Sequence, residues 1–271
     1  MSLIRIALRI AAVEALKGRT LVGANVLDSP NGALDIQADG SLRTDAEKPF
    51  IAIFTDQGKA ENITGRSLTE NGACDIIFEM GVSSAMFQTD PVTSETVMIG
   101  INIPATDSSR EFFLDVVQRQ IRDALTDPDN AWAEIYRNLH YRVRKIEFAG
   151  ARNTEDGQKL AGHQMRLTVD LADDPVKGEG LHPETPLLKF LEALDATDDA
   201  DYQEQAAKMR SLLTGSTEEW EQLQTRHGMT AGELLALGQG PLSADVDRAT
   251  PSMDSGTLDV AGRTSVAVAD P

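Results

Sequence analysis

Histidines are the side chains of this chain best suited to metal or acid–base chemistry. They stand apart in the sequence, and none falls in HExxH or HxH spacing. His182 and Glu184 could share a metal only if the fold brought further ligands to them. Isolated histidines are more often structural, so the sequence predicts no metal site. The four histidines are His140, His163, His182 and His227.

Cys74 is the single cysteine, so the chain forms no internal disulfide. It opens an apolar stretch, which indicates a buried, inert thiol and a reducing compartment. The patterns GxSxG, GxxxxGK[ST] and GxGxxG do not occur. We therefore expect no enzymatic activity and no cofactor. A hydrolase that uses His163 or His182 is the enzymatic alternative.

A helix–turn–helix pattern spans Trp220–Leu237, with Gly228 in the turn. A recognition helix presents Arg, Lys, Asn or Gln to the DNA groove. The second helix here offers Thr230, Ala, Gly and Glu233 and then leucines, and its flanks are acidic. A plain helical hairpin is the better interpretation, and a DNA-binding regulator is kept as an alternative.

Charge restricts the partners of this 271-residue chain. It has 25 basic and 43 acidic residues, a net charge of −18. Such a surface does not bind nucleic acid or anionic membranes as a whole. A local group of cations could pair with carboxylates of its own chain or meet an acidic surface on another subunit. The candidate subunit-interface residues are Arg5, Arg9, Arg137, Arg142, Arg144, Lys145 and Arg152.

Membrane insertion is not expected, because no run of about 18 apolar residues occurs. The apolar start of the chain is interrupted by Arg5, Arg9 and Glu14, which also argues against a signal peptide.

The first region, residues 1–175, alternates between helical and strand patterns. An apolar helix over Ser2–Lys17 is expected to be a core helix, or one shared with a neighbouring subunit. A capping box of Ser108 and Glu111 predicts the start of a long helix, and a second helix follows it. Strands are expected over Leu21–Leu27, Phe50–Thr55 (central in the sheet), Cys74–Phe87, Tyr141–Phe148 and Leu160–Leu171.

This order predicts an α+β fold with a mixed or antiparallel sheet flanked by helices. Residues 176–238 are expected to form a small helical domain with four capped segments, two of them opened by capping boxes of Ser216 with Glu219 and Thr230 with Glu233. Residues 239–271 have few large apolar side chains and are expected to form a flexible tail. Helices this short are marginal alone, so they are expected to pack on one another or on the main domain. The residues expected to form their shared core are Leu187, Phe190, Leu191, Tyr202, Met209, Leu213, Trp220, Leu223 and Leu235.

The first region resembles the tail terminator proteins of long-tailed bacteriophages and of related gene transfer agents. The resemblance rests on the order and spacing of generic pieces, which begin with the apolar helix Ile4–Leu16. The other pieces are the strand entry Glu47-Lys48-Pro49-Phe50-Ile51-Ala52-Ile53-Phe54-Thr55, the strand Cys74-Asp75-Ile76-Ile77-Phe78-Glu79, the helix Asp115–Leu125 with Trp132-Ala133-Glu134-Ile135-Tyr136, and Arg166-Leu167-Thr168-Val169-Asp170-Leu171.

The resemblance implies a non-enzymatic α/β protein that forms a homohexameric ring on the completed tail tube. Such a ring ends tube growth and presents the surface that joins the head, so the implied partners are the tail tube protein and a head-completion or neck protein. DNA would pass through the channel without specific binding. The implied location is the virion, at the head–tail junction, and the host cytoplasm during assembly. Family members are often only about as long as the first region, so the resemblance says nothing of residues 176–271.

Two long polar loops, Asp28–Lys48 and Asp56–Gly72, could dock onto tube subunits. Their candidate docking residues are Arg43, Lys48, Lys59 and Arg66. Another head–tail connector of the same virion is the alternative within this class.

Overall fold

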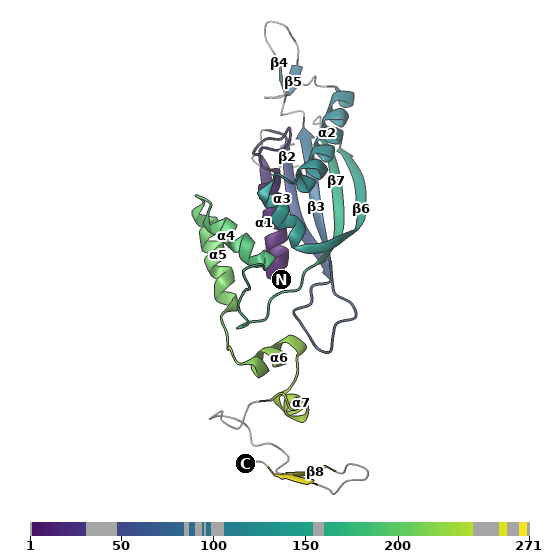
Figure 1. Cartoon of the computed structure of the whole chain (residues 1–271). Helices are drawn as coiled ribbons and strands as arrows, with labels where there is room; N and C mark the ends of the chain where they lie inside the picture. Colours follow the sequence, from purple (N-terminus) through teal and green to yellow (C-terminus); the bar gives the residue numbers. More distant parts are fainter. Residues whose placement is uncertain are drawn as a thin grey trace.

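A computed structural model describes residues 2–30, 48–83, 87–89, 94, 96–98, 106–153, 160–240, 255–258 and 266–269. Its centre is a five-stranded sheet with helices on one face (Figure 1). The elements of the first region are α1 (Leu3–Leu16), β1 (Val26–Asp28), β2 (Phe50–Lys59), β3 (Ala73–Ser83), β4 (Phe87–Thr89), β5 (Thr96–Met98), α2 (Asp107–Thr126), α3 (Ala131–Asn138), β6 (His140–Asn153) and β7 (Leu160–Leu171).

The sheet has the order β1-β2-β3-β7-β6. Only β1 and β2 run parallel, and the other neighbours are antiparallel. The expectation of an α+β fold with a mixed sheet is confirmed. Phe50–Thr55 lies on β2, which is buried and has a neighbour on each side, but the middle strand is β3. β2 is the second strand in this order, and only the three-residue strand β1 lies outside it.

The predicted first strand, Leu21–Leu27, is wrong over most of its length. Gly18 and Gly23 adopt positive φ angles of 70° and 68°, and the amide of Gly18 donates to the carbonyl of Gly23 at 2.9 Å. This turn continues the chain after α1, so the strand begins only at Val26. Glycine permits this backbone conformation without the steric cost that a side chain adds.

The core lies between the sheet and α1, α2 and α3. Alternate residues of β7 are buried as predicted: Met165, Leu167, Val169 and Leu171 are all at most 7 % exposed. The matching residues of β3 from Cys74 to Val82 are buried as well. α1 contacts both the sheet and the other helices, and ten of its residues are buried. It is therefore a core helix of the single chain.

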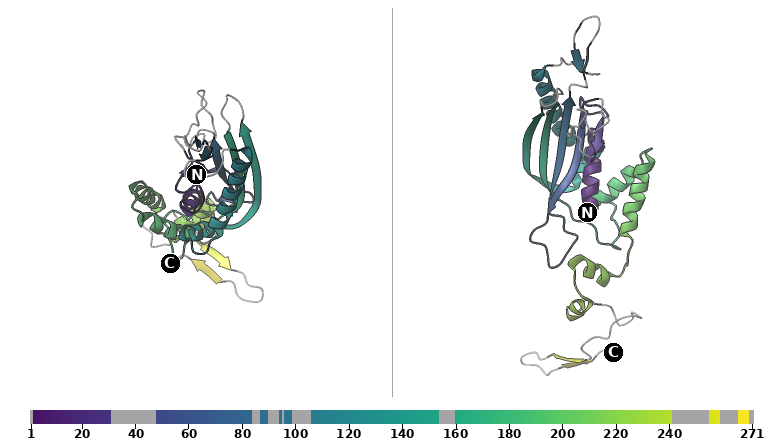
Figure 2. Two further views of the ribbon diagram at one scale, coloured as in Figure 1. Left: turned by 90° about the horizontal axis from the view of Figure 1, so that it is seen from above. Right: turned by 180° about the vertical axis from the view of Figure 1, so that it is seen from behind.

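The opposite face of the sheet is polar and carries no helix in the view from behind (Figure 2, right). Gln164 donates to Glu79 at 3.0 Å, and Thr168 donates to Asp75 at 2.6 Å. A sheet of mainly antiparallel strands can leave one face to solvent in this way.

The four predicted C-terminal helices are present as α4 (Pro186–Asp195), α5 (Ala200–Leu213), α6 (Glu219–His227) and α7 (Ala231–Ala236). α4 and α5 pack on the main domain, which is one of the two expected arrangements, but the four helices do not share one core, so the predicted shared core is wrong. Phe190 of α4 meets Trp132 of α3 edge to face at 6.3 Å, and Tyr202 of α5 donates to Glu14 of α1 at 2.8 Å. α4 and α5 thus extend the main core. Trp220, Leu223 and Leu235 lie outside this core.

α6 and α7 form a separate hairpin below the sheet (Figure 1). It contacts the loop between β2 and β3, because the amide of Arg66 donates to the carbonyl of His227 at 3.3 Å. Gly228 ends α6 with φ 60°, and a Cβ there would lie 2.4 Å from the Arg66 carbonyl oxygen. The predicted Thr230–Glu233 capping box is present. The predicted Ser216–Glu219 box is wrong, since Glu218 is the N-cap of α6.

Two small antiparallel hairpins complete the described chain. One joins β4 to β5, and the other joins β8 (Ser255–Leu258) to β9 (Val266–Ala269). The second hairpin falls in the segment for which a flexible tail was expected. The rest of that segment after Gly240 lies outside the residues that the structure describes.

Candidate functional site

The edge strand β6 carries an apolar strip that the described part of the chain leaves about half exposed. We define the β6 strip as Val143, Ile146 and Phe148, which are 43 %, 44 % and 53 % exposed. Their partners on β7 are Val169, Leu167 and Met165, all of which are buried in the core. Directly paired residues of antiparallel strands point to the same face. The strip therefore continues the core-facing side of the sheet beyond its helices.

Cations accompany this strip on the same strand. Arg142 donates to Asp170 at 2.6 Å, and Arg144 forms an ion pair with the same carboxylate. Burial opposes ionisation of Asp170, but hydrogen bonds from both arginines hold its pKa below the usual range. Lys145 pairs with Glu147 at 2.7 Å. These cations match the first of the two expected explanations, internal pairing, yet the two arginine side chains remain 69 % and 47 % exposed.

Two of the other predicted interface cations, Arg5 and Arg9, have partners within the chain. Arg5 donates to the carbonyl of Thr55, and Arg9 pairs with Asp28. Both contacts tie α1 to the sheet. The backbone of Arg152 lies in β6, and its side chain is outside the described part of the structure.

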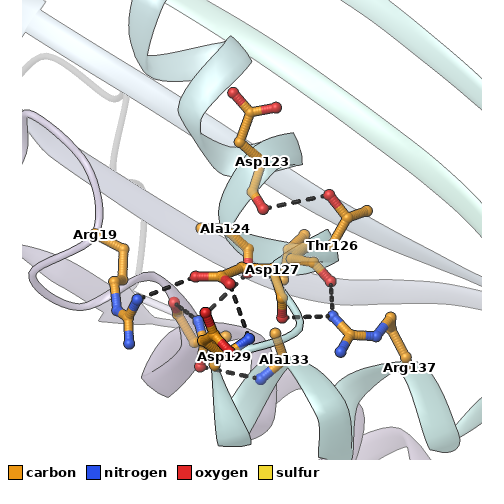
Figure 3. Close-up of polar contacts among 11 residues, drawn as sticks. Arg19, Asp123, Ala124, Thr126, Asp127, Asp129, Ala133 and Arg137 are labelled. Atoms are coloured by element: carbon orange, nitrogen blue, oxygen red, sulfur yellow. Dashed lines mark hydrogen bonds and ion pairs between the residues drawn. The ribbon is translucent and has the colours of Figure 1, made fainter.

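Arg137 stabilises the turn between α2 and α3 (Figure 3). Its guanidinium donates to the carbonyls of Leu125 and Asp127 at 2.9 and 3.1 Å. A cation satisfies the free carbonyls at a helix C-terminus and complements the helix dipole there. Asp127 also pairs with Arg19 at 3.1 Å, which ties this turn to the chain that follows α1.

The candidate docking loops differ in what the structure describes. Arg43 lies outside the described residues, and Lys48 is exposed at the start of a described segment. Lys59 pairs with Glu61 at 2.6 Å at the end of β2. Arg66 pairs with Glu233 of α7, so this cation links the loop to the helical hairpin.

A cluster that sequence spacing did not reveal joins α2 to β7. Glu111 and Asp115 lie one turn apart on α2, and both carboxylates approach His163 of β7. The i,i+4 spacing of the two acids can be read from the sequence. Their meeting with a histidine about 50 residues later depends on how α2 crosses the sheet.

The other side chains that could be reactive, Cys74, His140 and His182, do not gather around a common centre in the described structure. Desolvation raises the pKa of the Cys74 thiol to about 11 and lowers the pKa of His140. Among the described residues, neither ring nitrogen of His140 has a hydrogen-bond partner, and its ring meets that of Tyr136 edge to face with the ring centroids 5.0 Å apart. His182 is exposed, and its Nδ1 accepts from the amide of Glu184 at 3.2 Å. His163 is thus the histidine that gathers carboxylates.

The helical hairpin has little to offer a DNA groove. Arg226 pairs with Glu179, and α7 has only six residues, with no basic side chain among them. The carboxylate of Glu233 accepts from the amide of Thr230 and from Arg66. The hairpin therefore uses its polar groups for capping and for contacts with its own chain.

Comparison with known proteins gives no family assignment. No protein-family model and no curated protein matches the chain. Within the described residues, no helix combines the length and apolar character needed to cross a membrane.

Proposed function

We propose that this chain is a structural assembly protein of the tail-terminator kind, which forms a ring on a phage-type tail tube and presents a joining surface for the head. The β6 strip is the observation that carries the proposal. A strand edge with exposed core-side residues needs cover, since unpaired edges readily pair with other chains. A second copy of the chain in the ring would supply that cover.

The paired cations of β6 suit such an interface. Arg142 and Arg144 lie on the same edge strand as the strip and pair with Asp170 on its other face, while the chain as a whole carries −18. An exposed arginine pair on one copy can meet the acidic surface of the next and reduce the like-charge repulsion between subunits. The net charge of −18 on each subunit still repels the next subunit. Salt screens this repulsion, so association should strengthen as salt is added.

The acidic surface also suits a ring through which DNA moves. A negatively charged channel wall repels DNA phosphates, so the passing genome would not bind to it. In this arrangement α4 and α5 brace the main domain, because they share its core. The α6–α7 hairpin would lie outside the channel and take part in head joining.

Removal of the coding sequence from the genome that carries it tests this function. Tails assembled without the chain should exceed the normal length, and a wild-type copy supplied in trans should restore that length. Electron micrographs give the length distribution directly. Tails of normal length in the absence of the chain would refute the proposed role.

A further inference from the structure

The cluster between α2 and β7 has the donor atoms of a transition-metal site. His163 Nε2 lies 3.1 Å from Glu111 Oε1, and His163 Nδ1 lies 3.8 Å from Asp115 Oδ1. One donor atom from each of the three residues can be chosen so that all lie within 4.8 Å of one another. His163 is only 9 % exposed, so its ring is held by the core while the carboxylates face outward.

The spacing agrees with coordination to one ion. Bonds of about 2.0–2.1 Å from zinc to nitrogen and oxygen place neighbouring ligand atoms roughly 2.9–3.4 Å apart. The 3.1 Å between His163 Nε2 and Glu111 Oε1 lies inside this range. A single ion binds one nitrogen of an imidazole, and Asp115 lies beside the other nitrogen, Nδ1. Its side chain is the most exposed of the three, at 64 %, so a rotation about its χ angles is what would bring its carboxylate to an ion on Nε2.

We propose that Glu111, Asp115 and His163 bind a divalent transition-metal ion, with Zn²⁺ as the best match. Imidazole nitrogen favours Zn²⁺ and its neighbours over Mg²⁺ and Ca²⁺, which prefer all-oxygen sites. Three protein ligands leave at least one position open to solvent. The bound ion would link α2 to β7 and stabilise the folded chain, by an amount that grows with the logarithm of the free ion concentration once this exceeds the dissociation constant.

Calorimetric titration of the full chain with ZnCl₂, after treatment with a chelator, tests the site. One Zn²⁺ per chain is expected, with Mg²⁺ and Ca²⁺ binding at least tenfold more weakly. Asp115→Asn and Glu111→Gln should each weaken Zn²⁺ binding by at least tenfold, and these partly exposed positions tolerate the change without loss of fold.

Asp123→Asn is the matched control, because Asp123 is an exposed carboxylate of the same helix that pairs with Arg119 at 2.9 Å. It should leave Zn²⁺ binding unchanged. His163→Gln should abolish preference for Zn²⁺ over Mg²⁺, with circular dichroism to verify that this variant is folded. Absence of one-to-one binding, or equal affinity in Asp115→Asn and Asp123→Asn, would overturn the site. The titration measures metal binding alone, so failure of the metal site would leave the proposed tail-capping function unaffected.

Discussion

Replacing Phe148 by Thr should weaken association between copies of the chain. A phenylalanine side chain covers about 150–250 Å² when buried, and Phe148 remains 53 % exposed, so about 100 Å² is left for a partner to cover. At about 25 cal/mol per Å², that area contributes about 2.5 kcal/mol. Threonine keeps one methyl group and the β-propensity of the site. The net loss is about 2 kcal/mol, or about a 30-fold rise in dissociation constant.

Sedimentation velocity of the full chain over a wide concentration range measures this effect. The wild type should shift to faster sedimentation at a lower concentration than the variant, and added salt should strengthen both associations. Leu212→Thr is the matched control, because Leu212 on α5 is 55 % exposed and lies far along the chain from β6. Thermal unfolding verifies that each variant is folded. Identical concentration dependence for wild type and Phe148→Thr would refute the reasoning about the strip.

Three further predictions concern the stability and reactivity of the single chain. Asp174 accepts from Ser2 Oγ and from the amides of Leu3 and Ile4 at the start of α1, so Asp174→Asn should lower the free energy of unfolding by about 1–2 kcal/mol in denaturant titrations; an unchanged midpoint would contradict this capping role. Burial lowers the pKa of His140 below 6.5 in the folded chain, so as pH falls this imidazole is protonated in the unfolded chain before it is in the folded chain. The free energy of unfolding should therefore fall as pH drops below 6.5, by at most about 1.4 kcal/mol per pH unit from this group. Denaturant titrations at pH 7 and 5.5 should show a smaller loss for His140→Phe than for the wild type, and equal losses would exclude His140 as the cause. Cys74, with its pKa of about 11, should react with maleimide far more slowly in the native chain than in denaturant, and fast native labelling would contradict its burial.

Regular alternation allowed the central strands to be predicted from sequence. β7 was placed at its observed bounds, and the buried face of β3 was correct, because period-two burial is a local property of one strand. α2 was also predicted, although its N-cap is Thr106 and not Ser108. Neighbouring hydroxyl residues compete for the cap, and the choice depends on how the preceding chain approaches the helix.

The β6 strip could not be read in the same way. Bulges at His140–Arg142 and Val143–Lys145 break the alternation, so Val143 and Ile146 share a face although they are three residues apart. Arg144 and Lys145 stand between these two residues, so the sequence indicates a charged segment and hides the apolar face. Which side of the strand is exposed depends on where the helices end across the sheet.

Contacts distant in sequence account for the remaining differences. The stripes of α4 and α5 indicated burial but not their partners. α4 packs on α1 and α3 of the main domain, and α5 packs on α4 and reaches α1 through Tyr202. Glu111, Asp115 and His163 likewise come together only through the packing of α2 against β7. Local patterns specify a face that must be buried, and tertiary packing decides which surface meets it.

Electron microscopy of purified tail tubes mixed with the full chain tests the central proposal most directly. A ring with six-fold symmetry should cap one end of each tube, and the Phe148→Thr variant should occupy fewer ends at the same concentration. Tubes whose ends stay bare at saturating wild-type chain would contradict the proposed role.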